Sequence, residues 1–356
     1  MRVDSFDFEL PERLIATEPL ANRDASRMLV VDEQGAASDH YVRNVAAYLK
    51  AGDVLVLNDA KVMNARLFGK RGEGRVELLI HQHQEGAATH WLAFAKPAKR
   101  LKPGDEITLE GEHVIEVLDK REDGQLLLDM RLEFAELVHY LEQHGHVPLP
   151  PYIQKHRGDQ AEDKSRYQTI FANDQKQRSV AAPTAGLHFT DALLAELEGK
   201  GVAIVHITLH VGAGTFLPVK VDDTDDHIMH SEYWEVSEMA AATINQAKQA
   251  GGRVVAVGTT SLRTLESAAE NGAVKAGHSA TDLFITPGYQ FKLVDVLLTN
   301  FHLPKSTLFM LVSAFSGTDV MKAAYAHAME QDYRFYSYGD ACLLHRHIYS
   351  ISKQQR

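Results

Sequence analysis

Cysteine is nearly missing from this sequence: Cys342 is the only one among 356 residues. A single thiol rules out any disulfide within the chain and any zinc or iron–sulfur site built from several thiolates. Because such usage is typical of a reducing compartment, we expect the protein in the cytoplasm. Long apolar runs are missing too, since none approaches the 18 residues of a membrane-spanning helix, and the acidic residues 1–9 lack the apolar centre of a secretory signal. We therefore expect neither a membrane span nor export.

The usual motifs of nucleotide and metal chemistry are also absent. The sequence contains no GxGxxG, no GxxxxGK[ST] and no HExxH. The ordinary dinucleotide fold, the P-loop and the common zinc-protease helix are therefore not predicted.

Positive charge is scarce and unevenly placed. The net charge is −11, which by itself disfavours a polyanionic partner, because Lys and Arg supply most of the affinity for phosphates. Between Lys61 and Lys102, however, nine basic residues stand against three acidic ones, so this window carries +6 and the remainder −17. The window is either a nucleic-acid contact or a set of solvated strand faces, and the contrast in charge keeps both interpretations open.

The spacing of apolar residues divides the chain into two kinds of structure. Residues 54–57 are a short buried strand, and short alternating segments between residues 66 and 132 predict a small antiparallel barrel or sandwich. A helix over 132–144 follows, and the prolines of 148–151 should prevent regular structure at a domain boundary. After Ser179 strands alternate with helices, which predicts a mostly parallel sheet with helices on its faces.

In this second region the expected strands are 202–211, 253–257, 283–285 and 294–298, with helices that begin after Thr190, Ser237, Ser306 and near Thr318. Because the carboxyl ends of parallel strands lie at one edge, we expect functional residues there. Two strand ends fit: one runs into Gly212, Gly214 and Thr215, the other into Thr259, Thr260, Ser261 and Arg263. Glycines and hydroxyls beside a helix start can bind an anion, but ordinary capped turns have the same composition.

Histidine is abundant, with nineteen residues. His206 and His210 are four apart in one expected strand and should share a face with Ile204 and Thr208. His227 and His230 lie among carboxylates, where a histidine can act as a general base. Structural histidines, a general base and a metal site all remain open. Two interpretations also remain open for a further set of polar residues, as ligand contacts or as residues of turns and of the core: Asn300, His302, Tyr338 and Asp340.

Six longer segments resemble one known family. They are residues 182–189 (APTAGLHF), 210–216 (HVGAGTF), 226–232 (DHIMHSE), 257–261 (VGTTS), 299–304 (TNFHLP) and 338–340 (YGD), and residues 1–3 and 65–69 agree. This sequence is similar to the S-adenosylmethionine:tRNA ribosyltransferase-isomerases of queuosine biosynthesis, over essentially the whole chain. The resemblance implies an α/β fold: a mostly parallel βα catalytic domain of residues 1–60 and 149–356, with a small antiparallel β-barrel, residues 61–148, inserted in it.

The resemblance also implies a transferase and isomerase reaction that modifies tRNA. The ribosyl part of S-adenosylmethionine moves onto 7-aminomethyl-7-deazaguanine at the wobble position, giving epoxyqueuosine-tRNA, adenine and methionine. S-adenosylmethionine is consumed as a cosubstrate, with no separate cofactor and no metal. The expected partners are that tRNA and S-adenosylmethionine, with no membrane, and the expected state is a monomer.

Roles for individual residues follow as hypotheses. His227 or His230, oriented by Asp226 or Glu232, would move protons. The substrate contacts would come from His188, His210, Gly212, Gly214, Thr215, Thr259, Thr260, Ser261, Arg263, Asn300, His302, Tyr338 and Asp340, with Arg263 as a fork for the methionine carboxylate. Phosphates of the tRNA would meet Lys61, Arg66, Lys70 and Arg71.

Two other functions compete with this one. A metal-dependent hydrolase of a nucleotide-like substrate would use His206, His210, His227 and His230 as ligands. A noncatalytic RNA-binding module is disfavoured, because such a protein would not need the polar strand ends.

Overall fold

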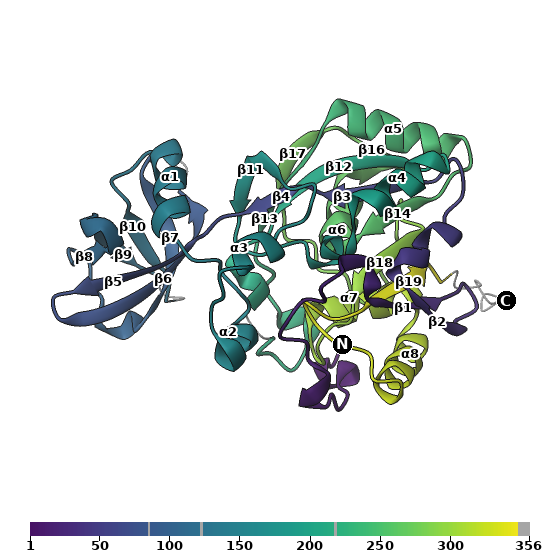
Figure 1. Ribbon diagram of the computed structural model, residues 1–356, viewed down its shortest axis with the longest axis horizontal. Coiled ribbons are helices and arrows are strands. Elements are labelled where there is room, and N and C mark those ends of the chain that lie inside the picture. Colours follow the sequence, from purple (N-terminus) through teal and green to yellow (C-terminus); the bar gives the residue numbers. More distant parts are fainter. Residues whose placement is uncertain (85, 122–123, 217–218, 348–356) are drawn as a thin grey trace.

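The protein consists of a large α/β body with a small β-barrel projecting from one end of it (Figure 1). This computed structural model describes residues 1–84, 86–121, 124–216 and 219–347. The body contains a nine-stranded sheet in the order β17-β13-β12-β3-β14-β18-β19-β1-β2. The strands are β17 (Gly277–Thr281), β13 (Glu232–Val236), β12 (Ala203–His210), β3 (Val54–Asn58), β14 (Val254–Val257), β18 (Val296–Asn300), β19 (Ala341–His345), β1 (Arg27–Val31) and β2 (Ala37–Tyr41).

The centre of the sheet is parallel. Strands β12, β3, β14 and β18 all run in one direction, whereas β13 and β19 run antiparallel to their neighbours β12 and β18. Every residue of β3, β14 and β18 is buried, as expected for strands covered on both faces. The predicted α/β class is confirmed.

Helices cover both faces of the sheet. The core on one face includes residues of α5 (Glu238–Gln249), α6 (Gly258–Ala268), α7 (Thr307–Ser316) and α8 (Thr318–Glu330). The other face packs against α4 (Asp191–Gly199) and the 3-10 helices η4 (Val42–Ala47) and η7 (Thr184–His188). Thr190, Ser237 and Ser306 cap α4, α5 and α7 by accepting a backbone N–H with their hydroxyls, as the sequence predicts.

The projecting unit is a closed six-stranded barrel, so of the two predicted shapes the barrel is confirmed. Its strands are β5 (Arg66–Arg71), β6 (Gly74–His83), β7 (His90–Lys96), β8 (Glu106–Leu109), β9 (Val114–Lys120) and β10 (Leu126–Asp129). Helix α1 (Phe134–His144) places Leu137, Tyr140 and Leu141 in the barrel core. The barrel strands and α1 thus lie within residues 66–144.

Short elements connect the two parts. Strand β4 (Ala60–Val62) pairs with β11 (Asn173–Ser179), and α2 (Pro151–Arg157) and α3 (Asp163–Arg166) lie between barrel and body. Other short elements are β15 (Ala269–Glu270), β16 (Ala273–Val274), η1 (Val3–Phe6), η2 (Glu12–Leu14), η3 (Arg23–Ala25), η5 (Ala98–Arg100), η6 (Glu110–Glu112), η8 (Ala213–Phe216) and η9 (Thr224–Asp226).

One local prediction is wrong, and another holds only in part. Residues 283–285 form no strand: the carbonyl of Leu283 accepts a hydrogen bond from Arg263, and its N–H donates to Thr281 Oγ1, so these backbone groups bond to side chains and not to a neighbouring strand. Residues 148–150 form no helix or strand, as predicted, but Pro151 is the first residue of α2, where a missing N–H costs nothing.

Candidate active site

One edge of the sheet collects most of the predicted substrate contacts. The parallel strands β12, β3, β14 and β18 end there, and the antiparallel strands β13 and β19 begin there. Glu232, the first residue of β13, therefore lies near the end of β12, and Asp340 lies beside the end of β18. Segments 210–216, 258–263, 299–302 and 338–340, far apart in sequence, meet at this edge. We call it the carboxyl rim.

A buried ion pair crosses one part of the carboxyl rim. Glu232 accepts a hydrogen bond from the Gly212 backbone N–H at 3.0 Å with one oxygen and contacts Arg263 Nη1 with the other. Both side chains are only 8% exposed. Arg263 Nε donates to the carbonyl of Leu283 at 3.1 Å. Glu232 is therefore engaged by Gly212 and Arg263 in this structure, and not by the histidines it was expected to orient.

One donor of Arg263 stays available. Among the described residues nothing accepts a hydrogen bond from its buried Nη2, and the buried hydroxyl oxygens of Thr260 and Ser261 on the same helix also lack partners. Thr259 is buried next to them. Buried polar atoms are nearly always hydrogen-bonded, so atoms like these favour a ligand that supplies the missing bonds.

The turn before these residues depends on glycine. Gly258 begins α6 with φ +85°, a conformation that residues with a side chain rarely adopt. Thr215, in the neighbouring turn after β12, is exposed and donates its backbone N–H to the carbonyl of Gly212 at 3.3 Å.

His230 lies directly against Gly214. A Cβ atom built on Gly214 would be 2.4 Å from Cδ2 of His230, so only glycine permits this approach. His227 packs its ring 5.2 Å from that of Phe284. Burial, and then the neighbouring His230, lower the pKa of His227. Asp226, the predicted partner of these histidines, is exposed.

A second group of polar residues surrounds the end of β18. Nε2 of His188 is 3.2 Å from Asn300 Nδ2, and Thr184 donates to Asn300 Oδ1 at 3.1 Å. Burial lowers the pKa of His188 to about 4, which keeps the ring neutral. Nε2 of this ring can therefore accept a hydrogen bond from the amide of Asn300.

Two other predicted contacts have partners within the protein. His302 Nε2 is 3.2 Å from Thr299 Oγ1, and burial lowers the pKa of His302 to about 3. Asp340 accepts from the backbone N–H groups of Arg27 and Arg334 at 2.9 and 2.8 Å. These bonds tie the start of β19 to the start of β1 and to the loop that precedes β19.

Tyr338 is buried and His210 is half-buried at the same rim, and each has one buried polar atom that is unused. In the part of the chain that the structure describes, His210 Nδ1 and the Tyr338 hydroxyl have no hydrogen-bond partner. The ring of His210 stacks on Tyr233 at 6.4 Å, and burial, followed by Arg178 and Lys176, lowers its pKa to about 4.

Most of the expected phosphate contacts are already neutralised. Lys61 pairs with Asp174 at 2.7 Å and Arg71 with Asp105 at 2.7 Å. Arg66 pairs with both Glu77 and Asp159, at 2.8 and 2.7 Å. Lys70 is the exception: it is exposed, and within the described ranges it has no ion-pair partner.

Some residues of the carboxyl rim are not predicted as site residues from the sequence. Asn58 bonds both backbone groups of Leu209, at 3.0 and 3.1 Å, and Asp59 accepts from Thr208 at 2.7 Å. Their position directly after the buried strand over 54–57 was a signal for them. Nothing in the local sequence marks Phe284.

Comparison with known proteins identifies the family. The sequence model described as "Queuosine biosynthesis protein" matches residues 3–344. The chain belongs to this family. The S-adenosylmethionine:tRNA ribosyltransferase-isomerases of Methylocella silvestris and Maricaulis maris are each 54% identical to it, over 97% of this chain and 98% and 99% of theirs. A crystal structure of the S-adenosylmethionine tRNA ribosyltransferase from Thermotoga maritima is 33% identical and aligns with a TM-score of 0.55, covering 96% of this chain and 99% of that one.

The structure of this member of the family does not support the metal-hydrolase alternative. Across the described residues, no three His, Cys, Asp or Glu side chains lie close enough together to hold a metal ion. His206 packs near Phe171 and His210 on Tyr233, so the four proposed histidine ligands do not converge. In the same part of the chain, no helix is long and apolar enough to cross a membrane.

Proposed function

We propose that this chain transfers and isomerises the ribosyl part of S-adenosylmethionine onto 7-aminomethyl-7-deazaguanine at the tRNA wobble position. The products are epoxyqueuosine-tRNA, adenine and methionine. Full-length membership of the family carries this assignment, because relatives at 54% identity bear the name of this activity. The chain is thus a transferase and isomerase of queuosine biosynthesis.

S-adenosylmethionine binds at the carboxyl rim, as a consumed cosubstrate and without a further cofactor. The unused donor of Arg263 and the partnerless hydroxyls of Thr260 and Ser261 support this position. Because Arg263 already holds Glu232 with Nη1, it offers the methionine carboxylate one nitrogen and not the two-nitrogen fork that the sequence suggested. Gly212 lets the backbone approach the ligand closely, and Gly214 lets the His230 ring lie against the same turn.

The histidines of the loop before β13 supply proton transfer. The sulfonium group acidifies the adjacent 5′ carbon, so a base that removes a proton there begins the elimination of adenine, which leaves more easily when it is protonated or hydrogen-bonded. His227 suits the base role because its lowered pKa keeps the ring neutral at neutral pH. The amine of the deazaguanine must be neutral when it attacks the sugar.

The tRNA spans two parts of the chain. We assign residues 1–60 and 149–356 to the catalytic domain and 61–148 to an inserted barrel domain, which contacts the RNA backbone. The protein works as a monomer in the cytoplasm, where tRNA and S-adenosylmethionine occur together.

The deciding experiment incubates the full chain with S-adenosylmethionine and tRNA that carries the deazaguanine precursor. Mass spectrometry should find the added sugar on the RNA, with adenine and methionine released in equal amounts. The matched control is the same tRNA with guanine at the wobble position, which should gain no mass. Release of adenine without any change in the RNA would reject the transferase assignment.

A further inference from the structure

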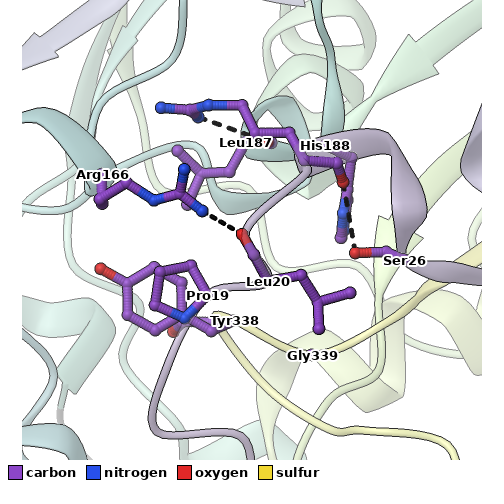
Figure 2. A pocket seen from close by; sticks show the side chains of 10 residues that line it. Pro19, Leu20, Ser26, Arg166, Leu187, His188, Tyr338 and Gly339 are labelled. Carbon is purple, nitrogen blue, oxygen red and sulfur yellow. Dashed lines mark hydrogen bonds between the residues drawn. The ribbon is translucent and has the colours of Figure 1, made fainter.

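A pocket beside the carboxyl rim is lined by two arginines that have no acidic partner in the part of the chain that the structure describes. Arg23, Arg166, His188 and Tyr338 line it, together with the loop of Pro19 and Leu20 (Figure 2). His188 is the residue that contacts Asn300 at the end of β18, so this pocket, which we call the arginine pocket, adjoins the candidate active site.

Both arginines bond only to backbone carbonyls among the described residues. Arg23 donates to Leu187 and Ser165, each at 3.2 Å. Arg166 donates to Ala21 at 3.2 Å and to Leu20, a contact visible in Figure 2. Carbonyl oxygens position a guanidinium without neutralising it. Burial lowers the pKa of Arg23, and the nearby positive charge of Arg166 lowers it further.

Nearby carboxylates are occupied elsewhere. Asp163 makes a two-pronged pair with Arg157, at 2.6 and 3.0 Å, and Asp340 accepts two backbone N–H groups. Glu18, whose backbone carbonyl accepts a hydrogen bond from Arg334, has an exposed side chain. A further arginine, Arg334, keeps its buried Nη1 without a partner among the described residues, as the Tyr338 hydroxyl does.

We propose that the arginine pocket binds one phosphodiester group of the RNA substrate, held by Arg23, Arg166 and the hydroxyl of Tyr338. This inference rests on the proposed function. Guanidinium groups match the oxygens of a phosphate, and an unpaired hydroxyl adds a further donor. The pocket therefore fixes the nucleotide chain next to the residues at the end of β18.

The contrast with the basic residues between Lys61 and Arg71 favours an RNA phosphate as the occupant. Lys61, Arg66 and Arg71, the basic residues expected to meet phosphates, already have carboxylate partners, whereas Arg23 and Arg166 do not. The methionine carboxylate of S-adenosylmethionine is the competing anion. Arg263, with its unused donor at the other part of the rim, is the better candidate for that group.

The test measures binding of the precursor tRNA, without S-adenosylmethionine, by Arg23→Gln, Arg166→Gln and Tyr338→Phe proteins. Each arginine variant should weaken binding by about tenfold, as expected for a lost hydrogen bond to a charged group, with KM for S-adenosylmethionine unchanged. The slope of log affinity against log salt should fall by about 0.7 to 0.9 for the lost contact. The matched control is Arg346→Gln, because Arg346 follows β19 at the opposite edge of the sheet.

Tyr338→Phe keeps the test valid if the arginine variants fail to fold. It removes a hydroxyl that has no partner among the described residues, so the unfolding temperature should hold while RNA affinity falls. Unchanged RNA affinity in a folded variant overturns the inference. So does a rise in KM for S-adenosylmethionine with RNA binding intact, which would assign the pocket to the carboxylate. Both failures are separate from that of the proposed function, which is judged by product formation in the unmodified protein.

Discussion

Glu232 and Arg263 form a buried ion pair that joins the start of β13 to α6 across the end of β12. The pair holds the Gly212 turn through the second carboxylate oxygen of Glu232. The shape of the candidate active site and the stability of the body therefore depend on the same two side chains.

We expect Glu232→Gln to destabilise the protein by about 3 kcal/mol, because it leaves the buried Arg263 charge without compensation. Urea unfolding of the full chain measures this difference. The control is Glu235→Gln on the same strand: its pair with Lys176 is partly exposed, so the loss should stay below about 1 kcal/mol. If both variants lost the same free energy of unfolding, the Glu232–Arg263 pair would contribute no more to stability than a partly exposed ion pair.

Gly214→Ala should disable the enzyme without unfolding it. The new methyl group would collide with the His230 ring and push it away, and a displaced catalytic group costs about 10- to 100-fold in kcat. Steady-state kinetics and thermal unfolding separate the two effects. Gly199→Ala is the matched control, since a Cβ there meets no atom within 4 Å. A Gly214→Ala enzyme with full turnover would remove His230 from the mechanism.

The rate of the reaction should persist at mildly acidic pH. His227 must be neutral to accept a proton, and because its pKa is lowered from 6.5, the acidic limb of kcat/KM should lie below that value. His227→Asn should lose about 10²- to 10⁴-fold in kcat and lose this limb as well. His139→Asn, on α1 of the barrel, serves as control. Near-normal turnover by both His227→Asn and His230→Asn would refute proton transfer by this loop.

Local signals explain which parts of the structure the sequence predicts. The caps at Thr190, Ser237 and Ser306 act within three residues of their own position, so a short window contains the whole interaction. The carboxyl rim is predictable for a different reason: parallel strands must end together, whatever their order in the sheet.

Long-range pairing explains what the sequence does not reveal. The partner of Lys61 is Asp174, 113 positions away, and Arg23 and Arg166 meet only in the folded chain. Strand β17 is exposed at four of its five residues and so carries no apolar pattern, whereas the apolar segment that follows it packs against the core without pairing. In this region the residues that pair as a strand are not the residues that are buried. The periodicity of apolar residues indicates burial and not pairing.

Two buried histidines should make the fold sensitive to acid. The pKa values of His188 and His302 are lowered to about 4 and about 3, so below pH 6.5 the unfolded chain takes up protons that the folded chain refuses. Stability is therefore full above pH 6.5 and falls as pH drops toward 4, by about 1.4 kcal/mol per pH unit for each histidine. Urea unfolding across this range measures the slope. His302→Gln should reduce it, and an unchanged slope would contradict the assignment.

Lys70 provides the sharpest test of RNA contact by the barrel. It lies on β5 on the same side as Arg66 and Phe68, since alternate residues of a strand share a face. Arg66 has two carboxylate partners, whereas Lys70 has none across the described ranges. Lys70→Ala should lower tRNA affinity and reduce the salt slope by about 0.7 to 0.9, the value for one phosphate contact.

Arg71→Ala is the matched comparison for Lys70→Ala, on the neighbouring residue. Arg71 must break its pair with Asp105 before it can bind a phosphate, so its removal should change the slope less. The two variants thus distinguish a specific contact from the general charge of the barrel, because a purely general attraction would respond equally to either lost cation. Equal slopes for both variants and the unmodified protein would place the RNA backbone away from β5.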